Sequence, residues 1–231
     1  AAGYQFTVTE PESEIACAIT NTPILPQLTL LKTVVNTGTA ADAVDTDWTL
    51  TATGPTADVT GIEGDGAITA AEVMPGTYTL SESGGPAYYT AGAWQCWNVD
   101  ANDVRGDVFD VAGSDITLAL ADRVECEIVN TAIPGTYTIA KGVDTDGDGV
   151  FDDDGATVKP GDTLTYQLSV THTSGAPISG ISLTDNVTAI LANATLGTLP
   201  AGVTLSGTTL TWAVPTLSTG TLTVTYQATV K

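Results

Sequence analysis

The stretch CEIVNTAIPGTYTIAKGV, Cys126–Val143, repeats the stretch CAITNTPILPQLTLLKTV, Cys17–Val34. In each copy an Asn precedes a Lys by eleven residues, although the chain contains only four lysines. The copies are offset by 109 residues, from Asn21 to Asn130, which is the length of a domain and far longer than a solenoid unit. We therefore predict that each copy marks a junction, where the last strand of one domain passes through a Pro-containing linker into the first strand of the next.

This interpretation divides the chain into three parts. We expect residues 1–22 to be the C-terminal strand of a preceding repeat, residues 23–133 a complete domain and residues 134–231 a second domain. Runs such as QLTLLKTV and TLTVTYQATV alternate apolar and polar residues, as β-strands do, and no window has a convincing helical period. The predicted fold class is all-β, with Ig-like or prealbumin-like β-sandwiches in tandem.

The charge of the chain limits its partners. It has 27 acidic and 6 basic residues, a net charge of −21, which repels nucleic acid and anionic lipid and attracts cations. No stretch reaches the roughly 18 consecutive apolar residues of a membrane span, so direct membrane insertion is not expected. Of the three cysteines, Cys96 and Cys126 can pair within one repeat, which indicates an oxidising, extracytoplasmic location. Cys17 has no free partner in this chain, and we expect any partner to lie outside it.

Strand parity places three polar residues in the core of the complete domain. Lys32 shares parity with Leu28 and Leu30 in the first strand, and Asn130 shares parity with Val124, Cys126 and Ile128 in the last strand. In GTYTLSE, Glu82 likewise shares parity with Tyr78 and Leu80. We therefore predict that Lys32, Glu82 and Asn130 are buried together.

Two interpretations of this buried set are open. The set is an ion pair with a hydrogen-bonded amide, or its polar tips reach water at the edges of the core. Because a buried ion pair rarely adds net stability, we also consider a reaction. An apolar pocket favours the neutral amine and the protonated acid. The Lys amine can then attack the Asn carboxamide while the acid relays protons, so that ammonia leaves and an amide joins the first strand to the last.

The segments LTLLKTV with Lys32, PGTYTLSES with Glu82 and EIVNTAIP with Asn130 together resemble the B-type repeat domains of Gram-positive collagen adhesins and pilins. The resemblance covers residues 23–133 and, as the tail of a preceding copy, residues 1–22. It implies an intramolecular isopeptide bond between Lys32 and Asn130 with Glu82 as the catalyst. The chain departs from the family in carrying Cys96 and Cys126, which leaves open whether an isopeptide bond and a disulfide form in one core.

The second domain contains VKPGDTLTYQLSVTHTSGAPISGISLTDNV, which resembles a different repeat family, found in tandem in bacterial wall-anchored and fimbrial proteins. Lys141 occupies the place of Lys32, and Asp185 shares the parity of Ile181 and Leu183, so an inward Lys–Asp pair could belong to a second triad. The last strand carries no Asn or Asp acceptor, so either the bond partner of Lys141 lies beyond Lys231 or Lys141 faces solvent, and we expect no crosslink within this chain. His172 lies on the apolar face of its strand, where a hydrogen-bonded core residue is expected.

The segment DTDGDGVFDDDG, residues 144–155, matches the first two-thirds of an EF-hand calcium loop. The alternative is a solvated acidic loop, and the match ends at Gly155, where an EF-hand has a bidentate Glu. Six Asp within eleven residues repel one another unless a cation is bound. We predict a calcium site, to which Asp153 or Asp154 could supply the missing carboxylate. Its predicted ligands are Asp144, Asp146, Asp148, the Val150 carbonyl, Asp152 and Asp153.

The chain carries no signature of a turnover enzyme, such as a nucleophile elbow, a His cluster for zinc or a phosphate-binding loop. We predict a structural stalk module of an extracellular adhesin or pilus at the bacterial cell wall or surface. Its partners would be neighbouring repeats or subunits of the same protein, and a host or environmental surface ligand is also conceivable. The alternatives are a filament subunit that donates its N-terminal strand to a neighbour, and a module that binds glycans or matrix proteins.

Overall fold

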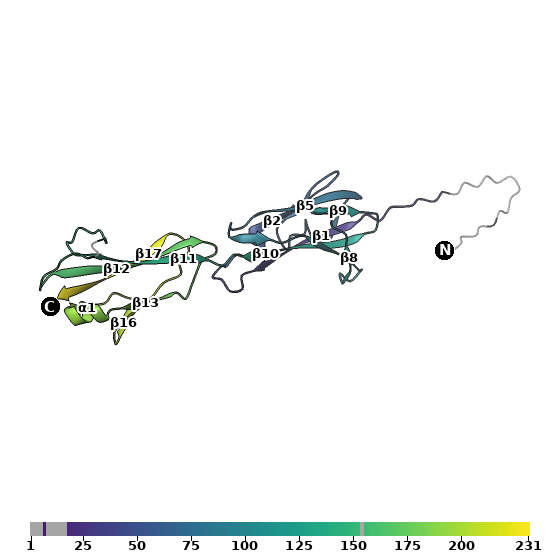
Figure 1. The fold of residues 1–231 in the computed structure, drawn as a ribbon. Helices are drawn as coiled ribbons and strands as arrows, with labels where there is room; N and C mark the ends of the chain where they lie inside the picture. The colour runs from purple at the N-terminus through teal and green to yellow at the C-terminus, as the bar shows by residue number, and fades with distance from the viewer. Residues whose placement is uncertain (1–6, 8–17, 153–154) are drawn as a thin grey trace.

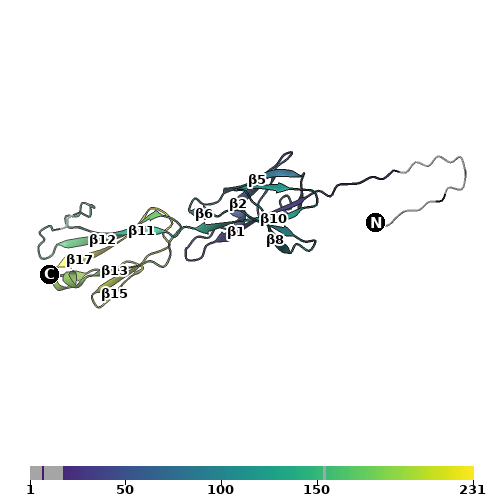
Figure 2. The same ribbon diagram turned by 45° about the vertical axis from the view of Figure 1, so that its right-hand side comes forward.

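The computed structural model describes Thr7 and residues 18–152 and 155–231. The described chain is almost entirely strand and turn, which confirms the predicted fold class. Domain 1 (residues 27–132) and domain 2 (residues 136–230) lie end to end (Figures 1 and 2). Within the described residues, no helix is long and apolar enough to span a membrane.

Domain 1 is a sandwich of two sheets. The larger sheet has the order β4-β1-β10-β7-β8, with β6 also paired to β10, and the smaller sheet has the order β3-β2-β5-β9. A short 3-10 turn, η1 (Asp45–Asp47), precedes β2. The strands are β1 (Gln27–Val35), β2 (Trp48–Thr53), β3 (Val59–Gly61), β4 (Ala71–Glu72), β5 (Gly76–Gly84), β6 (Tyr89–Ala91), β7 (Gln95–Val99), β8 (Arg105–Phe109), β9 (Asp115–Leu118) and β10 (Arg123–Ala132).

The first and last strands of domain 1 are neighbours. β1 and β10 run parallel, and their register places Lys32 opposite Ile128 and Val34 opposite Asn130. Alternate residues of both strands face the second sheet and are buried, as strand parity predicts. The core between the sheets joins residues of both, for example Leu30 and Ile128 from one and Leu50 and Leu80 from the other.

Domain 2 is a second sandwich, with a four-stranded sheet of order β11-β12-β17-β14 and a three-stranded sheet of order β13-β16-β15. Its core includes Val170 and Tyr226 from the first sheet and Leu210 and Trp212 from the second. The strands are β11 (Thr136–Asp144), β12 (Thr163–Ser174), β13 (Ser182–Asn186), β14 (Ala194–Leu196), β15 (Val203–Ser206), β16 (Thr209–Ala213) and β17 (Thr221–Val230).

One short segment of this all-β chain is helical. Residues Thr188–Asn193 form α1, a helix of six residues. The Asn186 side chain accepts the Thr188 backbone N–H at 3.0 Å and so helps to begin it. A helix of fewer than two turns has no room for a repeating apolar pattern, which is why the sequence shows no helical period there.

The two domains meet through a loop of domain 2, residues 175–179, between β12 and β13. The Ala176 N–H donates to the Ile133 carbonyl at 2.8 Å, and the Ala40 N–H donates to the Pro177 carbonyl at 3.2 Å. The Ile133 N–H in turn donates to the Tyr88 carbonyl at 2.8 Å. Backbone hydrogen bonds therefore link domain 2 directly to one loop of domain 1 and, through the linker residue Ile133, to a second.

The predicted strand of residues 1–22 lies mostly outside the described residues, as does Cys17. Residues 18–22 are not part of a strand, and the Ile19 side chain is 89% exposed. Residues that follow this segment do contact domain 1, because the Ile24 carbonyl accepts the Ala121 N–H at 2.9 Å and the Pro26 carbonyl accepts the Val73 N–H at 3.0 Å.

Candidate functional site

Lys32 lies on β1 with its side chain fully buried between the two sheets. The apolar residues on either side of it in the alternating pattern hold this strand face inward. Its backbone N–H points the other way, toward the edge of the sheet, and donates to Glu63 Oε2 at 2.6 Å. At this position β1 has no strand on that side, since β4 pairs only with Gln27 and Leu28. The Glu63 carboxylate therefore replaces a strand partner.

Glu82 approaches Lys32 from the opposite sheet. It lies near the end of β5, with its side chain 14% exposed, and its Oε2 is 2.9 Å from Lys32 Nζ. The contact is an ion pair by distance, although its angles fall outside those of a hydrogen bond. Burial lowers the pKa of Lys32 below its usual value of 10.5, and the pairing with Glu82 offsets part of this shift.

Asn130 completes the set. It lies on β10, only 2% exposed, and its Nδ2 donates to Glu82 Oε1 at 2.8 Å. Among the described residues, Asn130 Oδ1 is buried and has no hydrogen-bond partner. Glu82 thus contacts the Lys32 amine with one oxygen and the Asn130 carboxamide with the other, in the place where strand parity predicts a buried triad.

Aromatic rings form one wall of this site. The Lys32 Nζ lies 4.9 Å from the centre of the Trp48 ring, and Trp48 itself meets the Tyr89 ring edge-on at 5.1 Å. The Tyr89 hydroxyl donates to Asn36 Oδ1 at 2.6 Å. The sequence analysis did not single out these residues or Glu63. Parity in DWTLTATG could have assigned Trp48 to the core, whereas Tyr89 begins a strand of three residues, too short to give a periodic signal.

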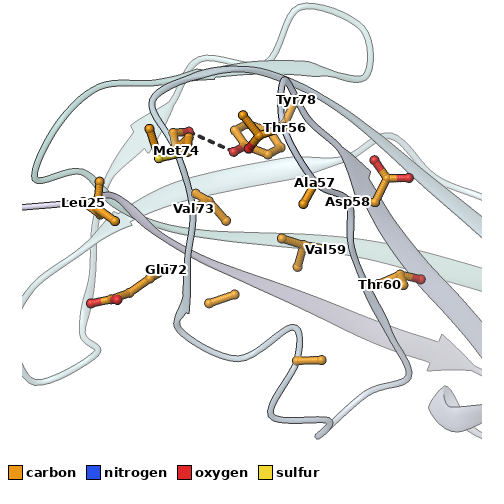
Figure 3. Close-up of a pocket in the computed structure, with 12 residues that line it drawn as sticks. Leu25, Thr56, Ala57, Asp58, Val59, Thr60, Glu72, Val73, Met74 and Tyr78 are labelled. Atoms are coloured by element: carbon orange, nitrogen blue, oxygen red, sulfur yellow. Dashed lines mark hydrogen bonds between the residues drawn. The ribbon is translucent and has the colours of Figure 1, made fainter.

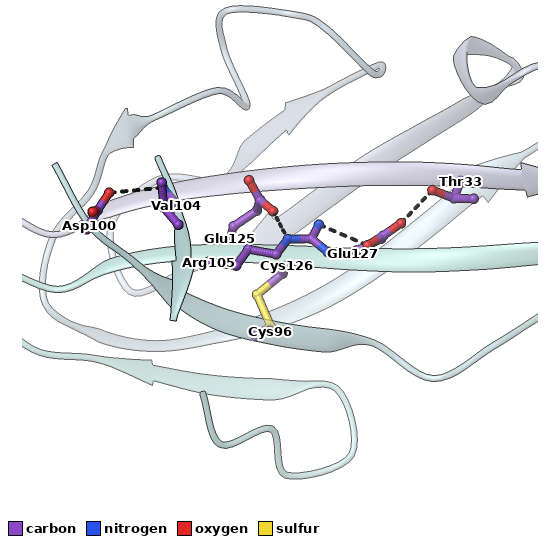
Figure 4. A network of polar contacts seen from close by, with 8 residues as sticks. All are labelled: Thr33, Cys96, Asp100, Val104, Arg105, Glu125, Cys126 and Glu127. Atoms are coloured by element: carbon purple, nitrogen blue, oxygen red, sulfur yellow. Dashed lines mark hydrogen bonds and ion pairs between the residues drawn. A yellow bond between two sulfur atoms is a disulfide. The ribbon is translucent and has the colours of Figure 1, made fainter. Parts of the chain in front are cut away.

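The disulfide lies on the same face of β10. Cys96 and Cys126 are directly opposite in the β7–β10 ladder, both fully buried, and they are joined by a disulfide (Figure 4). The cysteine pairing predicted from the sequence is therefore present. Asn130 lies four residues further along the same strand, so a disulfide and the Lys32–Glu82–Asn130 set are accommodated in one core.

The opposite face of β10 carries a charged network (Figure 4). The Arg105 guanidinium pairs with Glu125, and its second nitrogen lies 2.9 Å from Glu127 Oε2. The Thr33 hydroxyl donates to Glu127 Oε1 at 2.5 Å, and Arg105 also lies over the Trp97 ring at 4.0 Å. These contacts join β1, β10, β7 and β8 across the outer surface. They are partly exposed, so they add little stability and offer no reactive group.

The acidic loop follows β11. Carboxylate oxygens of Asp144, Asp146 and Asp148 all lie within 4.8 Å of one another. Asp144 is 6% exposed, and its two oxygens accept the backbone N–H groups of Gly147 at 2.6 Å and Gly149 at 3.1 Å. Val150 and Asp152 lie in the same loop, while Asp153 falls outside the described residues. The structure thus brings together three of the predicted calcium ligands.

Domain 2 has a charged cluster of its own. Lys141 Nζ lies 2.8 Å from Asp185 Oδ2, and the Tyr226 hydroxyl donates to the same oxygen at 2.6 Å. Burial, followed by the bond to Asp185, raises the pKa of Tyr226 well above its usual range. The Lys141 side chain is 37% exposed, unlike Lys32, and its cluster with Asp185 and Tyr226 contains no carboxamide. His172 Nε2 lies 3.1 Å from the Ala176 carbonyl, as expected for a hydrogen-bonded core residue.

A cavity of about 310 Å³ opens near the end of domain 1 where the chain enters β1 (Figure 3). It is lined mainly by small and apolar residues, including Leu25, Val59, Val73 and Met74. The Tyr78 hydroxyl at its wall donates to the Met74 carbonyl at 2.8 Å. This cavity contains no pairing of charged side chains comparable to the Lys32 site.

Residues 25–128 match the SpaA_2 family, described as a prealbumin-like fold domain. This match covers most of domain 1, and domains of this type are typical of extracellular surface and pilus proteins. Domain 1 is therefore a prealbumin-like β-sandwich, of a kind consistent with a pilin or surface-protein module. No curated protein and no solved structure matches the chain.

Proposed function

We propose that this chain is a structural stalk module of a bacterial cell-surface adhesin or pilus, stiffened by an isopeptide bond between Lys32 and Asn130. The observation that carries the proposal is the buried contact set of domain 1, in which Glu82 lies 2.9 Å from the Lys32 amine and 2.8 Å from the Asn130 carboxamide nitrogen. The match of residues 25–128 to a prealbumin-like fold domain supports the class of protein.

The reaction needs a neutral amine beside a carboxamide. Burial lowers the pKa of Lys32, which increases the fraction of neutral amine at any given pH. Lys32 Nζ attacks Cγ of Asn130, the Nζ–Cγ bond forms and the Cγ–Nδ2 bond breaks. Glu82, which contacts both groups, transfers one proton from Nζ to Nδ2, and ammonia leaves. The products are one amide bond and one ammonia, so atoms and charge balance.

The contact between Glu82 and Asn130 serves this chemistry in either orientation of the amide. A half-turn of the carboxamide exchanges Oδ1 and Nδ2, and assignment of the two depends on their hydrogen bonds. With Oδ1 beside Glu82, the proton that Glu82 accepts from Lys32 can be donated to the carbonyl oxygen, which stabilises the charge that develops there during attack. The turn would also give a partner to Asn130 Oδ1, which otherwise has none among the described residues.

The reaction is directed at the chain itself and occurs once, so we do not assign the module a turnover activity. Its location would be the cell wall or surface, outside the cytoplasm, in keeping with the buried disulfide. Its partners would be neighbouring repeats of the same protein, in contact end to end as domains 1 and 2 are here. A host or environmental ligand would then be bound elsewhere along the fibre.

Calcium is proposed as a second stiffening element. The donor set fits a hard cation, since Asp144, Asp146 and Asp148 present only oxygens and lie within 4.8 Å of one another. Val150 and Asp152 would supply further oxygens from the same loop. The ion would neutralise carboxylates that otherwise repel one another close to the start of domain 2.

Intact-mass measurement of the full chain tests the crosslink. The mass should be lower than that of the sequence by one ammonia, after the two hydrogens of the disulfide are allowed for. Digestion should release a branched peptide that joins the Lys32 and Asn130 segments. Lys32→Met and Asn130→Ala should each abolish the loss of ammonia. Lys159→Met, at an exposed Lys, should still show it. A wild-type mass without the loss would leave a buried ion pair and contradict the proposal.

A further inference from the structure

The loop of domain 2 between β12 and β13 inserts a side chain into the end of domain 1. Ala176 is fully buried, although it lies in a loop, and it packs with Ala41 and Ala132 of domain 1. The rings of Tyr88 and Tyr89 cover this cluster. Domain 2 therefore completes a small apolar core whose other members all belong to domain 1.

This small core and the Lys32 site share a wall. Tyr89, which packs on the alanine cluster, is also the ring that meets Trp48 edge-on at 5.1 Å, and Trp48 in turn faces the Lys32 amine. Both sites are also linked along the backbone, because Ala132 is two residues after Asn130 and β6 pairs Tyr89 with Ala132 and Ala91 with Asn130. A displacement of Tyr89 would therefore disturb both the alanine cluster and the Lys32 site.

Close backbone contacts hold this loop of domain 2 against the linker, residues 133–135. Gly175 has φ +82°, and a Cβ there would lie 2.3 Å from the Pro134 carbonyl oxygen. A Cβ on Gly135 would lie 2.1 Å from the Ala176 carbonyl oxygen. Only glycine allows the chain to approach so closely at these two positions, so the loop is fixed on the linker that leads to domain 1.

We propose that residues 175–178 of domain 2 act as the lid of the crosslinking site, so that the Lys32–Asn130 bond forms rapidly only after domain 2 has folded and docked on domain 1. The proposal rests on the isopeptide bond proposed above. Docking fixes Tyr89 against Trp48 and excludes water from the Lys32 amine. Without it, Tyr89 loses one of its packing surfaces, water reaches the amine, and the charged form, which cannot attack, prevails.

The test follows bond formation in the full chain. Protein prepared unfolded, before the bond has formed, is refolded, and samples are quenched with time for intact-mass measurement. Ala176→Arg places a charged side chain at a fully buried position and should prevent docking. We expect the loss of ammonia to slow by about tenfold or more, because the hydrated amine of Lys32 is held in its charged form, which cannot attack. Ala201→Arg, at an exposed turn of domain 2, should react as the wild type does.

A second variant separates docking from the folding of domain 2. A short Gly-Ser insertion after Pro134 lengthens the linker and leaves both sandwich cores intact, and it should slow the bond to a similar degree. Small-angle scattering monitors the docking itself. If the insertion variant scatters as an undocked pair of domains yet forms the bond at the wild-type rate, the lid is refuted while the isopeptide bond stands. If the wild type never loses ammonia, both proposals fail.

Discussion

The amine of Lys32 and the carboxylate of Glu82 lie 2.9 Å apart, with the Lys side chain fully buried. They come from opposite sheets of one sandwich, so the contact crosses the core. A buried ion pair is costly to desolvate and gives little net stability. We therefore expect the pair to serve a reaction with a third residue, Asn130, which Glu82 also contacts.

Glu82→Gln should abolish the crosslink, because the amide keeps the size and polar contacts of Glu82 but cannot carry a proton. The intact mass should rise by one ammonia relative to the wild type, apart from the mass of the substitution. Loss of a bond that closes a loop of nearly 100 residues should lower the stability of domain 1 by about 4–5 kcal/mol. Glu72→Gln, at an exposed position, is the control. A Glu82→Gln chain that still loses ammonia would exclude Glu82 as the proton carrier.

In a chain that cannot crosslink, such as Asn130→Ala, stability should rise as the pH rises toward the usual pKa of Lys. The pKa of Lys32 in the folded chain is below 10.5, so the unfolded chain binds more protons between the lowered value and 10.5. The cost of burying Lys32 is therefore full below the lowered pKa and is lost above 10.5. Urea denaturation across this range measures the effect.

The matched variant for this measurement is Lys32→Met in the same Asn130→Ala background. It contains the same tyrosines, several of which have a pKa raised by burial, so their titration cancels in the difference between the two chains. The difference in free energy of unfolding should shrink with increasing pH. A difference that is constant with pH would mean that Lys32 titrates in the folded chain as it does in the unfolded one.

The double variant Cys96→Ala/Cys126→Ala should still form the isopeptide bond. The sulfur atoms make no contact that the Lys32 site requires, and the two strands remain paired by their ladder. Removal of a link between residues 30 apart in sequence should cost about 3–4 kcal/mol, best measured in a Lys32→Met background. The mass of the double variant should again be lower by one ammonia. If the double variant shows no loss of ammonia, the disulfide is needed to align the strands.

Calcium should stabilise domain 2. At about 100 times its Kd, the ion should add roughly 2–3 kcal/mol to the free energy of unfolding, seen as a higher Tm that a chelator reverses. Asp146→Asn combined with Asp148→Asn should remove the effect, because both residues belong to the oxygen cluster. Asp58→Asn in domain 1 changes the net charge without altering the loop, and the stabilisation by calcium should remain. A Tm that changes with neither calcium nor chelator would contradict the site.

Asp185→Ala should destabilise domain 2 by about 1–3 kcal/mol, because the buried Tyr226 hydroxyl loses its acceptor. Asp185→Asn retains an acceptor for Tyr226 and should cost less. Lys141→Met should leave the single loss of ammonia unchanged, since this cluster contains no carboxamide. A second loss of ammonia that disappears in Lys141→Met would reveal a crosslink in domain 2. Denaturation and intact mass together check these outcomes.

Strand parity was sufficient to predict the inward direction of Lys32, Glu82 and Asn130, because long regular strands with one buried face leave little freedom of register. The same reasoning could not supply Tyr89 or Ala176. Tyr89 begins a strand of only three residues, too short to show alternation, and Ala176 lies in a loop, which has no repeating pattern that reports burial. Glu63 was missed for a related reason, since its partner is a backbone N–H at a sheet edge, which any residue type provides.

The parallel pairing of β1 and β10 determines how domain 1 would respond to pulling. Force applied at Gln27 and at Ala132 acts along the two strands in opposite directions, so the ladder between them is loaded in shear and its hydrogen bonds must break together. With Lys32 bonded to Asn130, the load would pass along residues 27–32, across one amide and out through residues 130–132. The remainder of the sandwich, including the disulfide, would lie outside the load path and could stay folded at forces that extend an ordinary domain.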